Sequence, residues 1–157
     1  MNLCLFRVGK RLTALIVLTA LGAGAAVAQV TAKDAWVRTT VPQQKATGVF
    51  LRLTALTDSR LIEVSSPLAG VAEIHSMVMV GNTMQMRAMS GLDVTAGKAL
   101  ELKPGGFHIM LLDLKQQIKV GDVVPVKLVF EDRSKKRETI EVQAPARAGL
   151  GVPQADH

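Results

Sequence analysis

The sequence predicts an all-β protein, an antiparallel β-sandwich or barrel, from three observations. Apolar residues cluster in short runs of about five to eight, the length typical of strands, and Gly, Pro, Asn and Asp separate them. No long stretch shows the 3.6-residue periodicity of an amphipathic helix. Without helices to cross between parallel neighbours, strands of this length and spacing pair antiparallel.

Eight strands are expected, each bounded by turn residues. The clearest turns fall at Gly81-Asn82, at 104–106, at 120–122 and at 132–136, where a basic cluster after two acidic residues is expected to form a charge-balanced, solvated loop. A chain of 157 residues without an internal repeat fits a single such domain. The expected strands are 33–39, 47–55, 72–80, 84–89, 99–102, 107–112, 123–130 and 138–143.

The first 28 residues are interpreted as a secretory signal peptide. Basic residues at Arg7, Lys10 and Arg11 precede a charge-free run from Leu12 to Val27, and small residues surround the expected cleavage point after Ala28. The run is shorter than the roughly 20 residues that span a bilayer, and no lipobox cysteine ends it. We therefore expect a periplasmic mature protein without stable membrane insertion. An uncleaved anchor is the competing interpretation.

The mature chain is expected to comprise one domain over 29–143 and a flexible tail over 144–157, which is rich in Ala, Gly and Pro. Removing the leader takes three of the 19 basic residues and no acidic one, so the net charge falls from +6 to +3. With one Trp, four Phe and no Tyr in the whole sequence, few aromatic rings can stack on bases. Nucleic acid is therefore not an expected partner.

Cysteine chemistry is excluded from the mature chain because the only cysteine, Cys4, lies in the leader. A blue-copper electron-transfer site needs a thiolate, and thiol oxidoreductases need cysteines. Scattered Ser, His and Asp form no recognisable arrangement of nucleophile and base. The chain is accordingly not expected to be an enzyme, and any soft metal site must use Met and His.

Methionine and histidine concentrate in one stretch. All six methionines after the first lie from 77 to 110, and His75 and His108 lie near the two ends of this stretch. If Gly81-Asn82 forms a two-residue hairpin turn, alternation of side chains puts His75 on the same face as four methionines. The strand containing His108 adds a thioether two residues later. The side chains expected on these shared faces are His75, Met77, Met79, Met84, Met86, His108 and Met110.

If the strand that contains His108 lies beside this hairpin, His75, Met86, His108 and Met110 come together. Two imidazoles and two thioethers form a soft, uncharged set that selects Cu(I) over Zn(II), Mg(II) or Ca(II). Met77, Met79 and Met84 are either auxiliary ligands or polarizable bulk around the site. A metal-free sandwich that uses its Met-rich face to bind a partner is the main alternative.

These residues resemble the signature of the periplasmic copper chaperones called PCuAC. That signature is a His, ten residues, a Met, twenty-one residues and then His-x-Met, and this sequence matches it at His75, Met86 and His108-Ile109-Met110. The surrounding sequence is similar at 35–38, 102–106 and 120–126. The resemblance covers about 35–142, nearly the whole mature domain.

The resemblance implies a cupredoxin-like β-sandwich that carries Cu(I). It implies that His75, Met86, His108 and Met110 are the ligands and that the acceptor is the dinuclear site of cytochrome c oxidase or another copper-assembly factor. The His- and Met-rich extension of some relatives has no counterpart here, because the tail offers only His157. Oxidase assembly and general copper tolerance or storage both remain open as the role.

Overall fold

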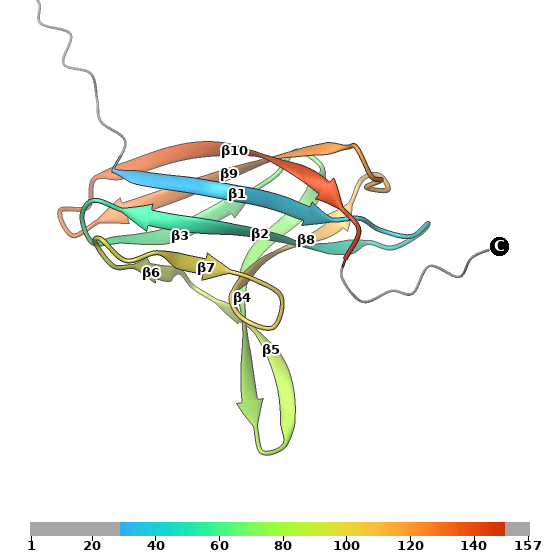
Figure 1. The fold of residues 1–157 in the computed structure, drawn as a ribbon, viewed down its shortest axis with the longest axis horizontal. Helices are drawn as coiled ribbons and strands as arrows, with labels where there is room; N and C mark the ends of the chain where they lie inside the picture. The colour runs from blue at the N-terminus through green and yellow to red at the C-terminus, as the bar shows by residue number, and fades with distance from the viewer. Residues whose placement is uncertain (1–28, 150–157) are drawn as a thin grey trace, which may run out of the picture.

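The computed structural model describes residues 29–149 and contains ten β-strands and no helix within them (Figure 1). No segment of this described part is therefore a helix that could cross a membrane. The predicted all-β fold class is confirmed. The strands are β1 (Val30–Arg38), β2 (Ala46–Ala55), β3 (Ser59–Ser65), β4 (Ala69–Val80), β5 (Thr83–Met89), β6 (Leu92–Val94), β7 (Leu100–Leu102), β8 (His108–Leu114), β9 (Val123–Asp132) and β10 (Arg137–Arg147).

Hydrogen bonds join the strands in the order β5-β4-β8-β2-β1-β10-β9-β3-β6, and β7 pairs with β2. This path folds over on itself, so that β3 lies against β4 and the two layers enclose one core. One pairing departs from the predicted antiparallel pattern: β1 and β10 run parallel, with Val37 opposite Ala146. A parallel pair needs a long connection, and the first and last strands of the domain have one.

Alternation along β8 separates the core from the candidate site. Ile109 and Leu111 are fully buried in the core cluster. Since successive side chains of a strand point to opposite faces, His108 and Met110 point away from these two residues. Burial of a large aliphatic side chain contributes about 1.5–3 kcal/mol, so the core residues fix which face of β8 carries the candidate ligands.

The β4–β5 hairpin projects away from the sandwich (Figure 1). β8 pairs with β4 only as far as His75 opposite His108, so the outer part of β4 pairs with β5 alone. The register is the one that the predicted two-residue turn at Gly81-Asn82 requires, with Met77 opposite Met86 and Met79 opposite Met84. Gly81 has a φ of 60°, a left-handed conformation that glycine adopts without a steric penalty in hairpin turns.

Two strands were not among those expected from the sequence, β3 and β6. In β3 a register shift between Leu61 and Glu63 breaks the alternation that would mark a strand. β6 has only three residues, too few to show any period.

The C-terminal boundary also differs from the prediction. β10 continues to Arg147, and Ala144 and Ala146 are buried. The tail predicted from residue 144 is therefore wrong at its start, because small apolar residues that suggest disorder in a sequence can also pack against a neighbouring strand. The predicted signal peptide and residues 150–157 lie outside the described residues.

Candidate metal centre

Two imidazoles face each other across the β4–β8 pair. His75 lies directly opposite His108 in the register, and their ring centroids are 5.8 Å apart with the planes at 66°. His108 is 5% exposed, and the His75 side chain is 12% exposed. The strand pairing thus holds both rings at one mostly buried position.

Each ring uses one nitrogen in a hydrogen bond. In the neutral tautomers that these partners favour, His108 Nδ1–H donates to the Gly106 carbonyl at 3.0 Å, and His75 Nε2–H donates to the Glu73 carboxylate at 2.8 Å. His108 Nε2 and His75 Nδ1 then keep their lone pairs. His75 Nδ1 is buried and has no hydrogen-bond partner within the described residues, an arrangement that is costly unless a ligand supplies one.

Three methionines and His108 line one pocket of about 310 Å³. Met77 and Met86 come from the β4–β5 pair, and Met110 comes from β8. His75 does not line this pocket, but its ring adjoins that of His108. Of the four principal candidates, the structure thus gathers Met86, His108 and Met110 around one cavity and places His75 beside them.

The two remaining candidates lie farther along the projecting hairpin. Met79 and Met84 face each other near its tip and are 61% and 46% exposed. Neither lines the pocket that contains His108. They share a face with Met77 and Met86, because residues two apart on a strand point the same way.

Sequence reasoning missed Glu73. Its carboxylate holds His75 in the tautomer that leaves Nδ1 free, the arrangement in which a carboxylate orients a metal-binding imidazole. Glu73 also lies opposite Met110 in the register. The available signal was the spacing of Glu73 and His75, two residues apart on a predicted strand face.

An aromatic wall beside the pocket was also missed. The ring of Phe50 lies 6.3 Å from that of His108 and 4.5 Å from that of Trp36, and the Arg38 guanidinium lies 5.6 Å from the Phe50 centroid. Gly48 makes room for this ring, since a Cβ there would come within 2.8 Å of it. No pattern within β2 alone indicates that Phe50 borders a site, because β1 and β8 supply its neighbours.

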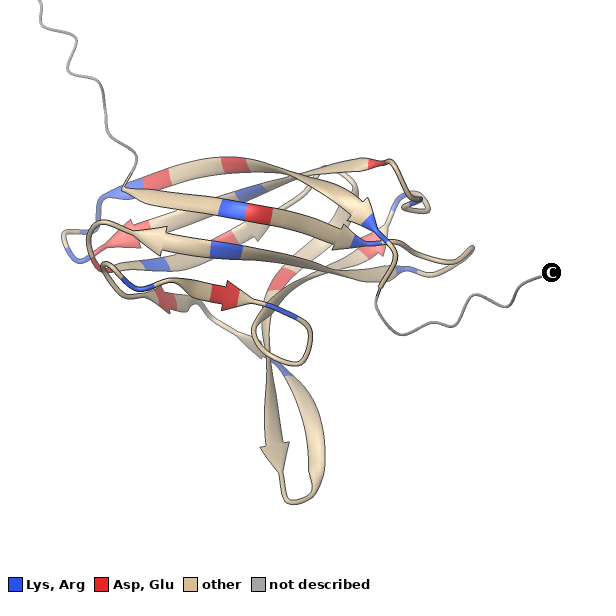
Figure 2. Ribbon diagram, in the orientation of Figure 1, with Lys and Arg blue, Asp and Glu red and all other residues tan. Residues whose placement is uncertain are grey.

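The candidate metal donors around the pocket of His108 are imidazole nitrogens and thioether sulfurs. Within 29–149, no group of three or more His, Cys, Asp or Glu side chains is arranged to hold a metal ion. Residues 76–86, which form the outer part of the β4–β5 hairpin, include no charged side chain (Figure 2). Imidazole with thioether is a combination that suits Cu(I), whereas Mg(II) and Ca(II) require oxygen ligands.

The fold is shared with solved PCuAC domains. The apo PCuAC domain from PmoF1 aligns with a TM-score of 0.64 at 22% identity, covering 80% of this chain and 98% of that domain. Apo-DR1885 from Deinococcus radiodurans aligns with a TM-score of 0.58 at 26% identity, covering 95% and 97%. The Cu(I) form of DR1885 aligns with a TM-score of 0.56 at 24% identity, covering 83% and 85%.

Sequence comparison identifies the family. A protein of Leifsonia xyli subsp. xyli described as "Putative lipoprotein Lxx21020" is 30% identical over 110 residues, which are 69% of this chain and 66% of that relative. The matched part thus spans slightly less than two thirds of the relative's length. The family model described as "Putative lipoprotein LpqE-like" matches residues 30–146. The chain belongs to the LpqE-like family.

Proposed function

We propose that this chain is an exported, non-enzymatic carrier that binds one Cu(I) ion through His75, Met86, His108 and Met110. The observation that carries the proposal is the pair of facing imidazoles, each of which keeps one nitrogen free while the other is hydrogen-bonded. The His75 Nδ1 lone pair is buried without a partner within the described residues. A bound ion would satisfy it.

The monovalent ion suits this donor set because two neutral imidazoles and two thioethers contribute no charge. Thioethers favour Cu(I) over divalent ions that prefer oxygen or nitrogen. The likeness to DR1885, which has been solved in apo and Cu(I) forms, supports the same cargo. Glu73 adds one negative charge beside the site without being counted as a ligand.

The candidate ligands differ in exposure, and this difference allows copper to be transferred by ligand exchange. Met86 lies on the edge strand β5 and is 48% exposed, whereas His108 is buried. An acceptor can therefore replace the exposed thioether first, while the imidazoles still hold the ion. The acceptor is the dinuclear copper site of cytochrome c oxidase or another copper-assembly factor, met in the periplasm after export.

The test is a titration of the purified chain with Cu(I) in the presence of a competing chelator. We expect one tightly bound ion per chain and a loss of affinity on the order of 100-fold in Met86→Leu/Met110→Leu, since leucine preserves volume but removes both sulfurs. Met89→Leu is the matched control, because Met89 packs against the core instead. A stoichiometry well below one, or unchanged affinity in the double variant, contradicts the proposal.

A metal-free interaction module is the second candidate, favoured by the exposure of Met79, Val80 and Met84 on the hairpin. Partner binding that survives complete loss of copper binding would support it. Cytochrome oxidase activity in a deletion strain at limiting copper separates the cellular roles. Lowered activity that added copper restores supports oxidase assembly, and normal activity supports copper tolerance or storage.

A further inference from the structure

The outer half of the β4–β5 hairpin presents a second pair of thioethers to solvent. Met79 and Met84 lie directly opposite each other, one register step beyond Met77 and Met86 on the same face. They are 61% and 46% exposed. Methionines that serve as core filler are buried, so packing within this chain does not account for this pair.

The chemistry around the pair is unusually free of competing groups. Residues 76–86 include no Asp, Glu, Lys or Arg, and this part of the hairpin lacks charge in Figure 2. β5 is an edge strand that pairs only with β4, so the hairpin leaves these side chains accessible. Among residues 76–86 the strongest donors for a soft metal are therefore the methionine sulfurs.

We propose that Met79 and Met84 form a second, weaker Cu(I) site from which the ion passes to the site of His75 and His108. This inference rests on the proposed function. Side chains opposite each other in an antiparallel pair have Cβ atoms about 4.5–5.5 Å apart. Two flexible methionine side chains at this separation can place both sulfurs on one ion.

The spacing of the pairs provides a path between the sites. Residues two apart on a strand are separated by about 7 Å, so the Met77/Met86 pair is the next step from the Met79/Met84 pair. Passage is ligand exchange alone: a bond from Cu(I) to the sulfur of Met86 forms as that to Met84 breaks, and copper stays monovalent. No proton or electron is transferred.

The outer site is weaker because it offers two exposed thioethers and no imidazole. It is therefore occupied only after the inner site is filled, or transiently as copper arrives or leaves. Its position near the tip of the projecting hairpin is accessible to a donor or acceptor protein (Figure 1). The exposed methionines thus contribute to copper movement instead of to the stability of the fold.

The experiment follows methionine ε-methyl NMR signals of the purified chain while Cu(I) is added to two equivalents under reducing conditions. We expect the first equivalent to shift the methyls of Met86 and Met110, and the second to shift those of Met79 and Met84. Met79→Leu/Met84→Leu should retain the first equivalent and lose the second. Met89→Leu, the control, should retain both.

The inference is overturned if the wild type takes up one equivalent only, or if Met79→Leu/Met84→Leu still takes up a second. Both results leave the proposed function intact. Absence of even the first equivalent refutes the proposed function, and the inference with it. Thermal unfolding confirms that the double variant is folded, which the exposure of both side chains leads us to expect.

Discussion

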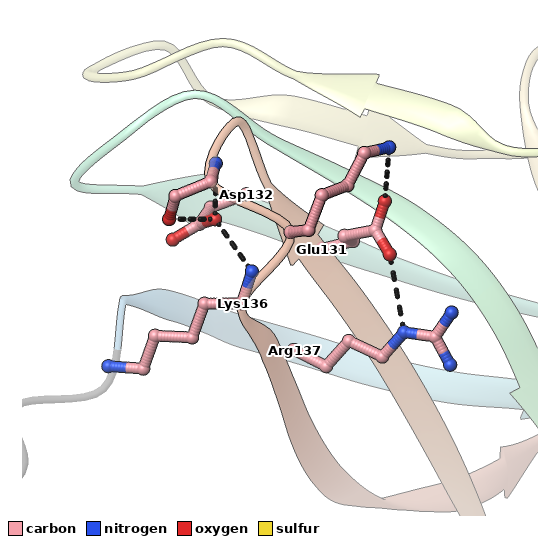
Figure 3. A network of polar contacts seen from close by, with 6 residues as sticks. Glu131, Asp132, Lys136 and Arg137 are labelled. Atoms are coloured by element: carbon pink, nitrogen blue, oxygen red, sulfur yellow. Dashed lines mark hydrogen bonds and ion pairs between the residues drawn. The ribbon is translucent and has the colours of Figure 1, made fainter.

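Two hairpins of this molecule treat their polar and polarizable side chains in opposite ways. In the β9–β10 hairpin, Glu131 accepts hydrogen bonds from Lys135 at 2.9 Å and from Arg137 at 3.2 Å, and Asp132 accepts from Ser134 and the Lys136 backbone (Figure 3). The charged groups there satisfy one another. The outer part of the β4–β5 hairpin, residues 76–86, has no charged side chain, and Met79, Met84 and Met86 are exposed there.

Cavity size alone is a poor guide to the proposed site. The pocket beside the β9–β10 turn has a volume of about 390 Å³, larger than the 310 Å³ beside His108. Its charged side chains are already paired, as Arg60 is with Asp93 and Arg133 with Asp58. The smaller pocket lies beside the buried His75 Nδ1, which has no hydrogen-bond partner among the described residues. A buried polar atom without a partner is a better sign of a ligand than the volume of a cavity.

The largest expected effect is stabilisation by copper. At a free Cu(I) concentration about 1,000 times the dissociation constant, binding to the folded state alone adds about 4 kcal/mol to the free energy of unfolding. This corresponds to a rise in melting temperature on the order of 10 °C. Thermal unfolding with and without Cu(I) measures it.

Matched variants tie this stabilisation to the pocket of His108. Met86→Leu/Met110→Leu should lose most of the shift, whereas Arg133→Ala, at the charged turn, should show the full shift. Equal shifts in both variants would mean that copper binds away from the pocket of His108.

The next effect concerns Glu73, which lies outside the donor set and holds His75. Glu73→Ala should lower Cu(I) affinity about 10- to 100-fold, because partners that orient a ligating imidazole contribute this much. Glu73→Gln keeps an oxygen acceptor and should recover part of the affinity. Chelator competition measures the affinity, and nitrogen chemical shifts of His75 report its tautomer.

If Glu73 only supports the fold, the two variants will change the melting temperature but leave the His75 tautomer and the copper affinity as in the wild type. Such a result would remove the distinction between the hairpins at this residue, since Glu73 would then resemble Glu131, a carboxylate with a purely structural pairing.

Much of the candidate site follows from local spacing. The register of the β4–β5 hairpin depends only on the position of the Gly81-Asn82 turn and on side-chain alternation, so Met77 opposite Met86 was predictable. The pairing of His75 with His108 joins segments distant in sequence, and the sequence suggested it only as a condition for a shared site. Phe50 and Arg38 were not predictable, because their place at the pocket depends on the order of β1, β2 and β8.

The all-β fold class was also predictable from local sequence patterns. The details of the fold that were predicted wrongly depend on tertiary context. The parallel pairing of β1 with β10 depends on how the sandwich closes, which no local pattern records. The continuation of β10 through Ala144 and Ala146 depends on burial against other strands. Alanine has no strong preference for strands, so only the neighbouring strands place these residues in one.

The smallest expected effect is a pH dependence confined to the charged hairpin. Hydrogen bonds from Lys135 and Arg137 lower the pKa of Glu131 below its ordinary value of 4.5, and those from Ser134 and Lys136 lower the pKa of Asp132 below 3.8. A carboxylate whose pKa is depressed in the folded state contributes stability above its unfolded pKa and loses it as the pH falls through the folded value. As the pH is lowered beneath about 4.5, the urea concentration at the unfolding midpoint should therefore decrease less steeply in Glu131→Gln/Asp132→Asn than in the wild type. The difference between the two proteins should shrink in high salt because exposed charges are screened. Equal slopes would show that these pairings do not contribute to stability. The satisfied hairpin would then differ from the Met-rich one in geometry but not in energy.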